Sequence, residues 1–85
     1  MQEFTHVISE TSRLHARPAA QLCDLASQFS STVTLSASSG SANARRLMAV
    51  MALAAKPGQH LTVTVEGADE EQAAAALKAF CSEHL

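Results

Sequence analysis

The chain has 85 residues, of which 47% are hydrophobic and 16% are charged, and its formal net charge is −2. A chain of this length is expected to form one domain over residues 1–85. Its core should be too small for a deep pocket, so any chemistry should lie at the surface. The slightly acidic balance and the lack of Trp and Tyr argue against nucleic-acid binding, which relies on basic patches and stacking aromatics.

Alternation of apolar and polar residues predicts a first strand over 4–9, in which Phe4, His6 and Ile8 share one face. Pro18 then marks the start of a helix, because its preset φ and missing N–H suit a first helical turn. An apolar stripe with helical spacing follows: Ala19, Leu22, Cys23, Ala26 and Phe29. A second strand is predicted over 32–36, where β-branched residues are frequent.

A predicted turn over 38–41 (S-S-G-S) leads back through a short strand at Ser41 and Ala42. Apolar residues at helical spacing over 47–54 predict a short helix that stops before Lys56 and the following proline. A strand with period-two alternation follows over 61–66. Asp69 and Gln72 have the spacing of a capping box at the start of a last helix. The order βαββαβα indicates an α+β fold, with helices on one face of an antiparallel sheet.

Residues 12–20 (S-R-L-H-A-R-P-A-A) join the first strand to the first helix. A helix that begins at or just before Pro18 places His15 at or near the N-cap, where backbone N–H groups lack intrahelical acceptors. The positive helix end disfavours imidazolium, so His15 should be neutral and nucleophilic near pH 7. After phosphorylation, the same N–H groups and Arg17 can hold the phosphoryl oxygens, and the Ser12 hydroxyl is within plausible reach. Taken alone, however, a His and an Arg at a helix start also fit a solvated loop pair.

The segment 14–19 (L-H-A-R-P-A) resembles the active-centre motif of the HPr family, the histidine-containing phosphocarriers of the bacterial phosphotransferase system. The similarity extends to the chain length, the segment 47–53, Gly58, the strand to Val65, Gly67 and the acidic start of the last helix. It implies an open-faced β-sandwich with a four-stranded antiparallel sheet and three helices on one face. It also implies that enzyme I phosphorylates His15 on Nδ1 and that His15 passes the group to the A domains of sugar transporters, with Arg17 as its anion partner.

The chain departs from the family pattern at three positions. Many members carry a regulatory Ser at the start of the second helix, where this chain has Arg46, so the site for kinase control is expected to be absent. Arg13 replaces the usual Gly before the Leu-His pair and adds a cation near the phosphate. Ala54 stands where members commonly have a Gly after the second helix, so the family's turn at this point is not carried over to this chain.

A partner-docking face should surround His15. We assign it to Leu47, Met48 and Met51 of the second helix, with Ala16 and Ala20 near the motif. Leu47 and Met51 are the better candidates for exposure, whereas for Met48 the core is favoured. Methionine suits a surface that must fit several partners. The adjacent pair Arg45 and Arg46 would favour acidic partner surfaces.

The most favoured function is therefore that of a stoichiometric phosphoryl carrier, not an enzyme, which acts in the cytoplasm as a monomer without cofactor or metal. An export signal and a run of apolar residues long enough to span a membrane are absent from the sequence, so no membrane insertion is expected. Cys23 and Cys81 should stay reduced and buried, with a regulatory disulfide as the alternative. The competing functions are an HPr-like regulatory module, for example of the nitrogen-linked branch, and a small α+β enzyme such as an acylphosphatase.

Overall fold

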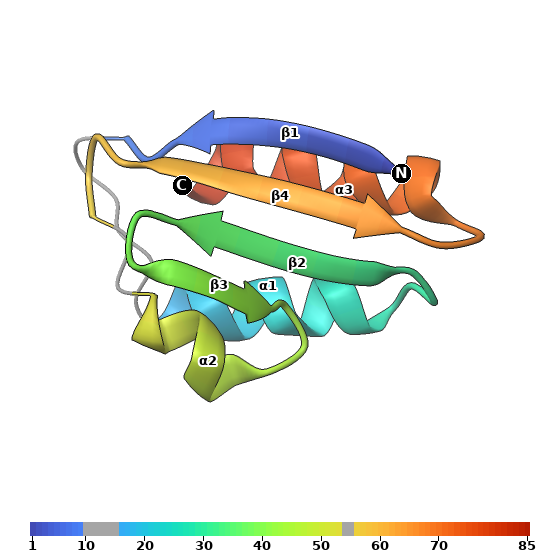
Figure 1. Ribbon diagram of the computed structural model, residues 1–85, viewed down its shortest axis with the longest axis horizontal. Helices are drawn as coiled ribbons and strands as arrows, with labels where there is room; N and C mark the ends of the chain where they lie inside the picture. The colour runs from blue at the N-terminus through green and yellow to red at the C-terminus, as the bar shows by residue number, and fades with distance from the viewer. Residues whose placement is uncertain (10–15, 54–55) are drawn as a thin grey trace.

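The computed structural model describes residues 1–9, 16–53 and 56–85. Its helices and strands follow the predicted order, which confirms the α+β fold (Figure 1). In chain order the elements are β1 (Gln2–Val7), α1 (Ala16–Ser27), β2 (Thr32–Ala37), β3 (Gly40–Asn43), α2 (Leu47–Ala52), β4 (His60–Glu66) and α3 (Glu70–His84).

The four strands form one antiparallel sheet in the order β1-β4-β2-β3. β4 shows the alternation that the sequence predicts: Leu61, Val63 and Val65 are buried, whereas Thr62 and Thr64 lie on the opposite face. Figure 1 shows α1 and α3 behind the sheet, so the apolar face of β4 is the one that the helices cover. The other face carries several hydroxyl side chains, among them those of Thr5 and Thr62, whose oxygens lie 3.3 Å apart.

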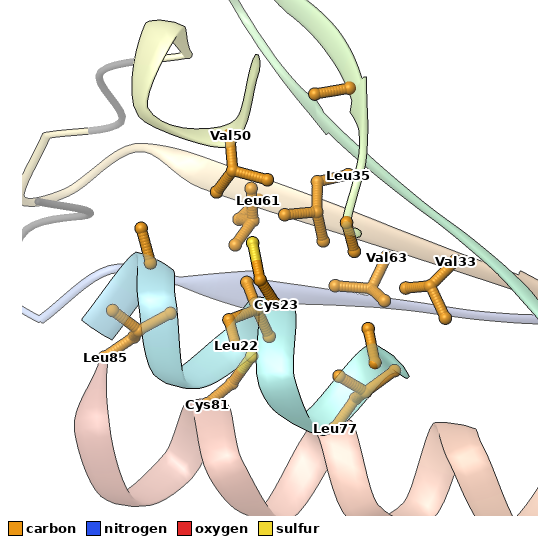
Figure 2. Close-up of a cluster of buried hydrophobic side chains, with 14 of the residues drawn as sticks. Leu22, Cys23, Val33, Leu35, Val50, Leu61, Val63, Leu77, Cys81 and Leu85 are labelled. Atoms are coloured by element: carbon orange, nitrogen blue, oxygen red, sulfur yellow. The ribbon is translucent and has the colours of Figure 1, made fainter. Parts of the chain in front are cut away.

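The core lies between the sheet and the helices. Val33 and Leu35 of β2 meet Leu22 of α1 and Leu77 of α3, and Val50 of α2 reaches the same cluster (Figure 2). Each of these five side chains is at most 1% exposed. All three helices therefore contribute to a single core.

Cys23 and Cys81 are both free and buried, as predicted, and they project into this core from α1 and α3 (Figure 2). Burial raises the pKa of the Cys81 thiol to about 11. Burial, and to a smaller degree the nearby Asp24 carboxylate, also raise the pKa of Cys23. Both thiols pack as small apolar groups and are poor nucleophiles, because the thiolate is the reactive form.

The predicted capping box at the start of α3 is wrong. Asp69 occupies the N-cap position, but its carboxylate makes no capping hydrogen bond. Instead, the backbone N–H groups of Ser30 and Ser31 donate to its two oxygens, each at 2.9 Å, and the Ser31 hydroxyl also donates to the carboxylate. Asp69 thus fastens the α1–β2 connection to the start of α3. Its donors lie almost forty residues earlier in the chain, beyond the reach of a local motif.

These hydrogen bonds make the stability of the protein dependent on pH. The bond from the Ser31 hydroxyl, followed by that from the Ser30 backbone, lowers the pKa of Asp69 from 3.8 to about 2. A carboxyl whose pKa is lower in the folded than in the unfolded state contributes its full stabilisation at pH values above the unfolded-state pKa. This stabilisation is lost as the pH falls through the folded-state pKa. We therefore expect the urea midpoint to decline between pH 3.8 and about 2, and Asp69→Asn to reduce this decline and to lower the midpoint at pH 7.

The matched control is Asp24→Asn, which removes an exposed carboxyl of α1 and should leave the decline in place. If Asp69→Asn follows the same curve as the unsubstituted protein from pH 7 to pH 2, Asp69 is not the group responsible.

Candidate functional site

The first turn of α1 carries the described part of the predicted motif. The helix begins at Ala16, so Pro18 lies within its first turn, in agreement with the predicted start at or just before this residue. Pro18 and Ala19 are buried, Arg17 is exposed and Ala20 is half-buried. The first N–H groups of a helix have no intrahelical acceptor, so the missing N–H of Pro18 removes no helical hydrogen bond. The structure thus places Arg17 at the surface of a helix N-terminus.

His15 and Ser12, the other two predicted site residues, lie outside the described residues, as do the departures Arg13 and Ala54. His15 is nevertheless joined by its peptide bond to Ala16, where α1 begins.

The electrostatic character of this helix end favours an anion. The first turn of α1 contains no acidic residue, so no carboxylate of that turn offsets the positive end of the helix dipole or the Arg17 guanidinium. The N-terminus of a helix attracts anions through its free N–H groups and its dipole. Arginine adds a planar set of donors that matches phosphate oxygens.

The second helix, α2, presents the predicted docking residues, but not as expected. Met48 is 77% exposed, the largest exposed fraction among the hydrophobic residues described as exposed, so its assignment to the core is wrong. Leu47 is 38% exposed, as predicted. Met51 is only half-exposed and packs against the core, so its expected exposure is also largely wrong.

The reason lies in the helical repeat. Val50 is completely buried, and Leu53 beyond the helix is 5% exposed, so these residues define the inner side of α2. At about 100° per residue, a side chain two positions before Val50 points roughly 160° away from it. Met48 therefore points to solvent, while Met51, one position after Val50, lies at the boundary of the core.

α2 packs against α1, and Figure 1 shows it beside the first turns of that helix. We call Leu47 and Met48 of α2 the α2 patch. Arg46 occupies the N-cap position of α2, makes no side-chain capping bond and offers no hydroxyl at this position.

Two further observations concern residues 1–9, 16–53 and 56–85. No helix within them is both long and apolar enough to cross a membrane. No three of their His, Cys, Asp and Glu side chains lie close enough together to hold a metal ion.

Known proteins resemble this chain over nearly its full length. The family model for the "PTS HPr component phosphorylation site" matches residues 2–83. The phosphocarrier protein HPr of Mycoplasma capricolum is 41% identical over 78 residues, which cover 92% of this chain and 88% of the relative. The HPr of Lysinibacillus sphaericus is 39% identical over 82 residues, covering 96% and 91% of the two chains. A solved structure of the histidine-containing phosphocarrier protein of Mycoplasma has a TM-score of 0.91 at 38% identity and covers 96% of this chain and 93% of its own.

Proposed function

Because this chain belongs to the HPr family of phosphocarrier proteins of the phosphotransferase system, we propose that His15 is the residue that accepts and donates the phosphoryl group. Proteins of this family carry a phosphoryl group between partners instead of catalysing a reaction of their own. The observation that supports His15 is its place in the chain directly before α1, whose first turn carries Arg17 and no carboxylate.

The chemistry of this position suits reversible transfer. A neutral imidazole beside a positive helix end has a free nitrogen lone pair that attacks the phosphorus atom of the phosphorylated donor. A new N–P bond forms as the bond between phosphorus and the donor breaks, and the donor leaves without its phosphoryl group. The phosphohistidine then gains negative charge, which the first-turn N–H groups of α1 and the Arg17 guanidinium stabilise. We include the Ser12 hydroxyl as a further donor to the phosphoryl oxygens. The site thus favours the neutral acceptor before transfer and the anion after it.

Phosphotransferase partners such as enzyme I follow from membership of the family. We propose enzyme I as the donor and the A domains of sugar transporters as acceptors, in the cytoplasm, with this chain acting as a monomer. Both kinds of partner would use the α2 patch, with Ala16 and Ala20 of α1 as further docking residues. One shared surface is sufficient, because donor and acceptor bind in turn.

Enzyme I and phosphoenolpyruvate provide the direct test. Incubation with both should add one phosphoryl group, seen by intact mass, and mild acid should remove it, as expected for a phosphoramidate. The proposal fails if no group is added, or if the added group survives acid as a phosphoserine would.

Arg17→Ala should slow transfer and lower the yield of phosphoprotein without unfolding the chain, because Arg17 is exposed. A charge-assisted hydrogen bond contributes about 1.5–3 kcal/mol, so the equilibrium yield should fall roughly 10- to 150-fold. Arg17→Lys is the matched control, and it should retain part of the yield because it keeps the charge but not the planar set of donors. Equal phosphorylation of folded Arg17→Ala and the unsubstituted protein would contradict this role.

Met48→Asp should impair transfer from enzyme I and to an A domain together. Loss of a central apolar contact typically costs at least about 2 kcal/mol, or roughly 30-fold in affinity. The thermal midpoint should hardly change, because Met48 is 77% exposed. Leu47→Asp tests the second residue of the α2 patch in the same assays.

The control for both variants is Ala75→Asp, which introduces the same charge at an exposed helical position on α3 and should leave transfer unchanged. Normal transfer in both directions by stable Met48→Asp and Leu47→Asp would remove α2 from the interface.

A further inference from the structure

Arg45, directly before the N-cap of α2, reaches across to the end of α1. Its guanidinium Nη2 donates a hydrogen bond to the backbone carbonyl of Phe29, which follows the last turn of α1. That last turn contains no basic residue of its own. A cation at a helix C-terminus interacts favourably with the dipole and with the last carbonyls. Arg45 therefore places a cation just beyond the C-terminal end of α1, which has none in its own last turn.

The backbone on both sides of Arg45 is also held. The Arg45 N–H donates to Asn43 Oδ1 at 2.9 Å, and the Arg46 N–H donates to the Asn43 carbonyl at 3.0 Å. The preceding Ala44 is completely buried, and its N–H donates to the Val33 carbonyl at 2.9 Å. The segment thus joins β2 and β3 to the start of α2, and the Arg45 side chain connects it to α1.

α2 depends on such external support. It has six residues and no side-chain capping bond, and helices of this length do not form in isolation because nucleation is unfavourable. Its inner side is fixed by Val50 and Leu53, which are buried. At its start Met48 is 77% exposed and Leu47 is 38% exposed, so these two side chains give this end less apolar support than Val50 and Leu53 give the rest of the helix. The hydrogen bond from the Arg45 side chain to the Phe29 carbonyl therefore adds to the backbone bonds of residues 44–46 in fixing this end of the helix.

We propose that Arg45 is a positioning residue: by bonding the Phe29 carbonyl just beyond α1, it helps to hold the start of α2 in the orientation that presents the α2 patch to partners. This inference rests on the proposed use of that patch for docking. It assigns to Arg45 a role different from that of Arg46, although both are exposed cations at the same surface. Arg46 can act on a partner only through its charge, whereas Arg45 acts mainly through the geometry of α2.

Salt and hydrogen exchange separate the two roles. Attraction between exposed charges is screened at high ionic strength, whereas a change in helix orientation persists. Hydrogen exchange reports local opening without any partner. The Val50 N–H is a suitable probe, because it donates to the Arg46 carbonyl at 2.9 Å in the first turn of α2. The Leu61 N–H, in the central strand of the sheet, serves as the reference for global stability.

The experiment compares Arg45→Gln, Arg45→Lys and Arg46→Gln, using Val50 exchange and phosphoryl transfer from enzyme I in low and high salt. In Arg45→Gln we expect the Val50 N–H to exchange about tenfold faster relative to the Leu61 N–H. Phosphoryl transfer by this variant should stay reduced in high salt. Arg45→Lys keeps one donor and the charge and should be intermediate. Arg46→Gln should leave Val50 exchange unchanged, and any loss of transfer should disappear in high salt.

If Val50 exchanges no faster in Arg45→Gln than in Arg46→Gln, the positioning role is wrong, even if transfer falls in low salt. The positioning role is also wrong if three results occur together: Val50 exchange rises in Arg45→Gln, the same variant transfers normally in high salt, and Met48→Asp does not transfer. Docking would then use the α2 patch but tolerate the loosened helix. Normal transfer by Met48→Asp and Leu47→Asp would instead overturn the docking proposal itself, and the role of Arg45 in presenting the patch with it.

Discussion

His15→Ala is expected to take up no phosphoryl group when incubated with enzyme I and phosphoenolpyruvate. The substitution removes the only side chain of the motif whose nitrogen can attack phosphorus and later release the group. Arg17 and the first-turn N–H groups of α1, which we propose to stabilise the charge, cannot form that bond. Intact mass measured against time should show a complete loss of labelling, the largest functional effect expected of any single substitution in this chain.

His60→Ala is the matched control for this result, because it removes an exposed imidazole from β4 and should be labelled like the unsubstituted protein. The thermal midpoint of His15→Ala must also be measured, so that a folding defect is not mistaken for loss of the acceptor. Undiminished labelling of His15→Ala would show that another residue accepts the group.

Gly67→Ala should cause the largest loss of stability, about 2–4 kcal/mol in the free energy of unfolding, from backbone strain and overpacking together. Gly67 has a φ of +155°, which side chains with a Cβ rarely adopt. A Cβ atom there would lie 2.6 Å from both Cα and Oγ of Ser31. Ser31 is completely buried and hydrogen-bonded to Asp69, so it has little room to move. Urea unfolding of the variant measures the loss.

Substitutions at two other glycines distinguish the cost of backbone strain from the cost of steric overlap. Gly40 and Gly58 also have positive φ values, +143° and +84°, but a Cβ at either position would meet no described atom within 4 Å. Gly40→Ala and Gly58→Ala should therefore show the cost of the backbone conformation alone. If Gly67→Ala is no more destabilising than these two, the close contact with Ser31 is not a constraint.

Local patterns predicted the elements well. The alternation in β4 identified both the strand and its buried face, because a two-residue period needs no knowledge of distant residues. Pro18 correctly placed the start of α1, because it satisfies a local rule of helix N-termini. Asp69 was misassigned for the opposite reason: its donors Ser30 and Ser31 are brought to it only by the tertiary fold.

The candidate site was predictable only in part. The physics of a helix start permits phosphate binding near Arg17 but does not require it, so His15 was identified mainly through the resemblance to a known family. The face of α2 was ambiguous, because six residues give too few repeats to distinguish the buried Val50 side from the Met48 side. The link from Arg45 to Phe29 had no sequence signal at all, since it joins a loop to a helix end elsewhere in the chain.

The strand order also has a consequence for how the protein is made. β4 lies between β1 and β2 and pairs with both, yet it is the last strand to leave the ribosome. Until His60–Glu66 has emerged, β1 has no neighbour in the sheet, and only the β2–β3 hairpin can pair. Folding must therefore wait for the last third of the chain and close long loops, which slows it relative to a protein built from local contacts. A nascent chain that ends before β4 would expose Phe4 of β1 and the apolar face of β2, and is the form in which this protein is most prone to aggregate.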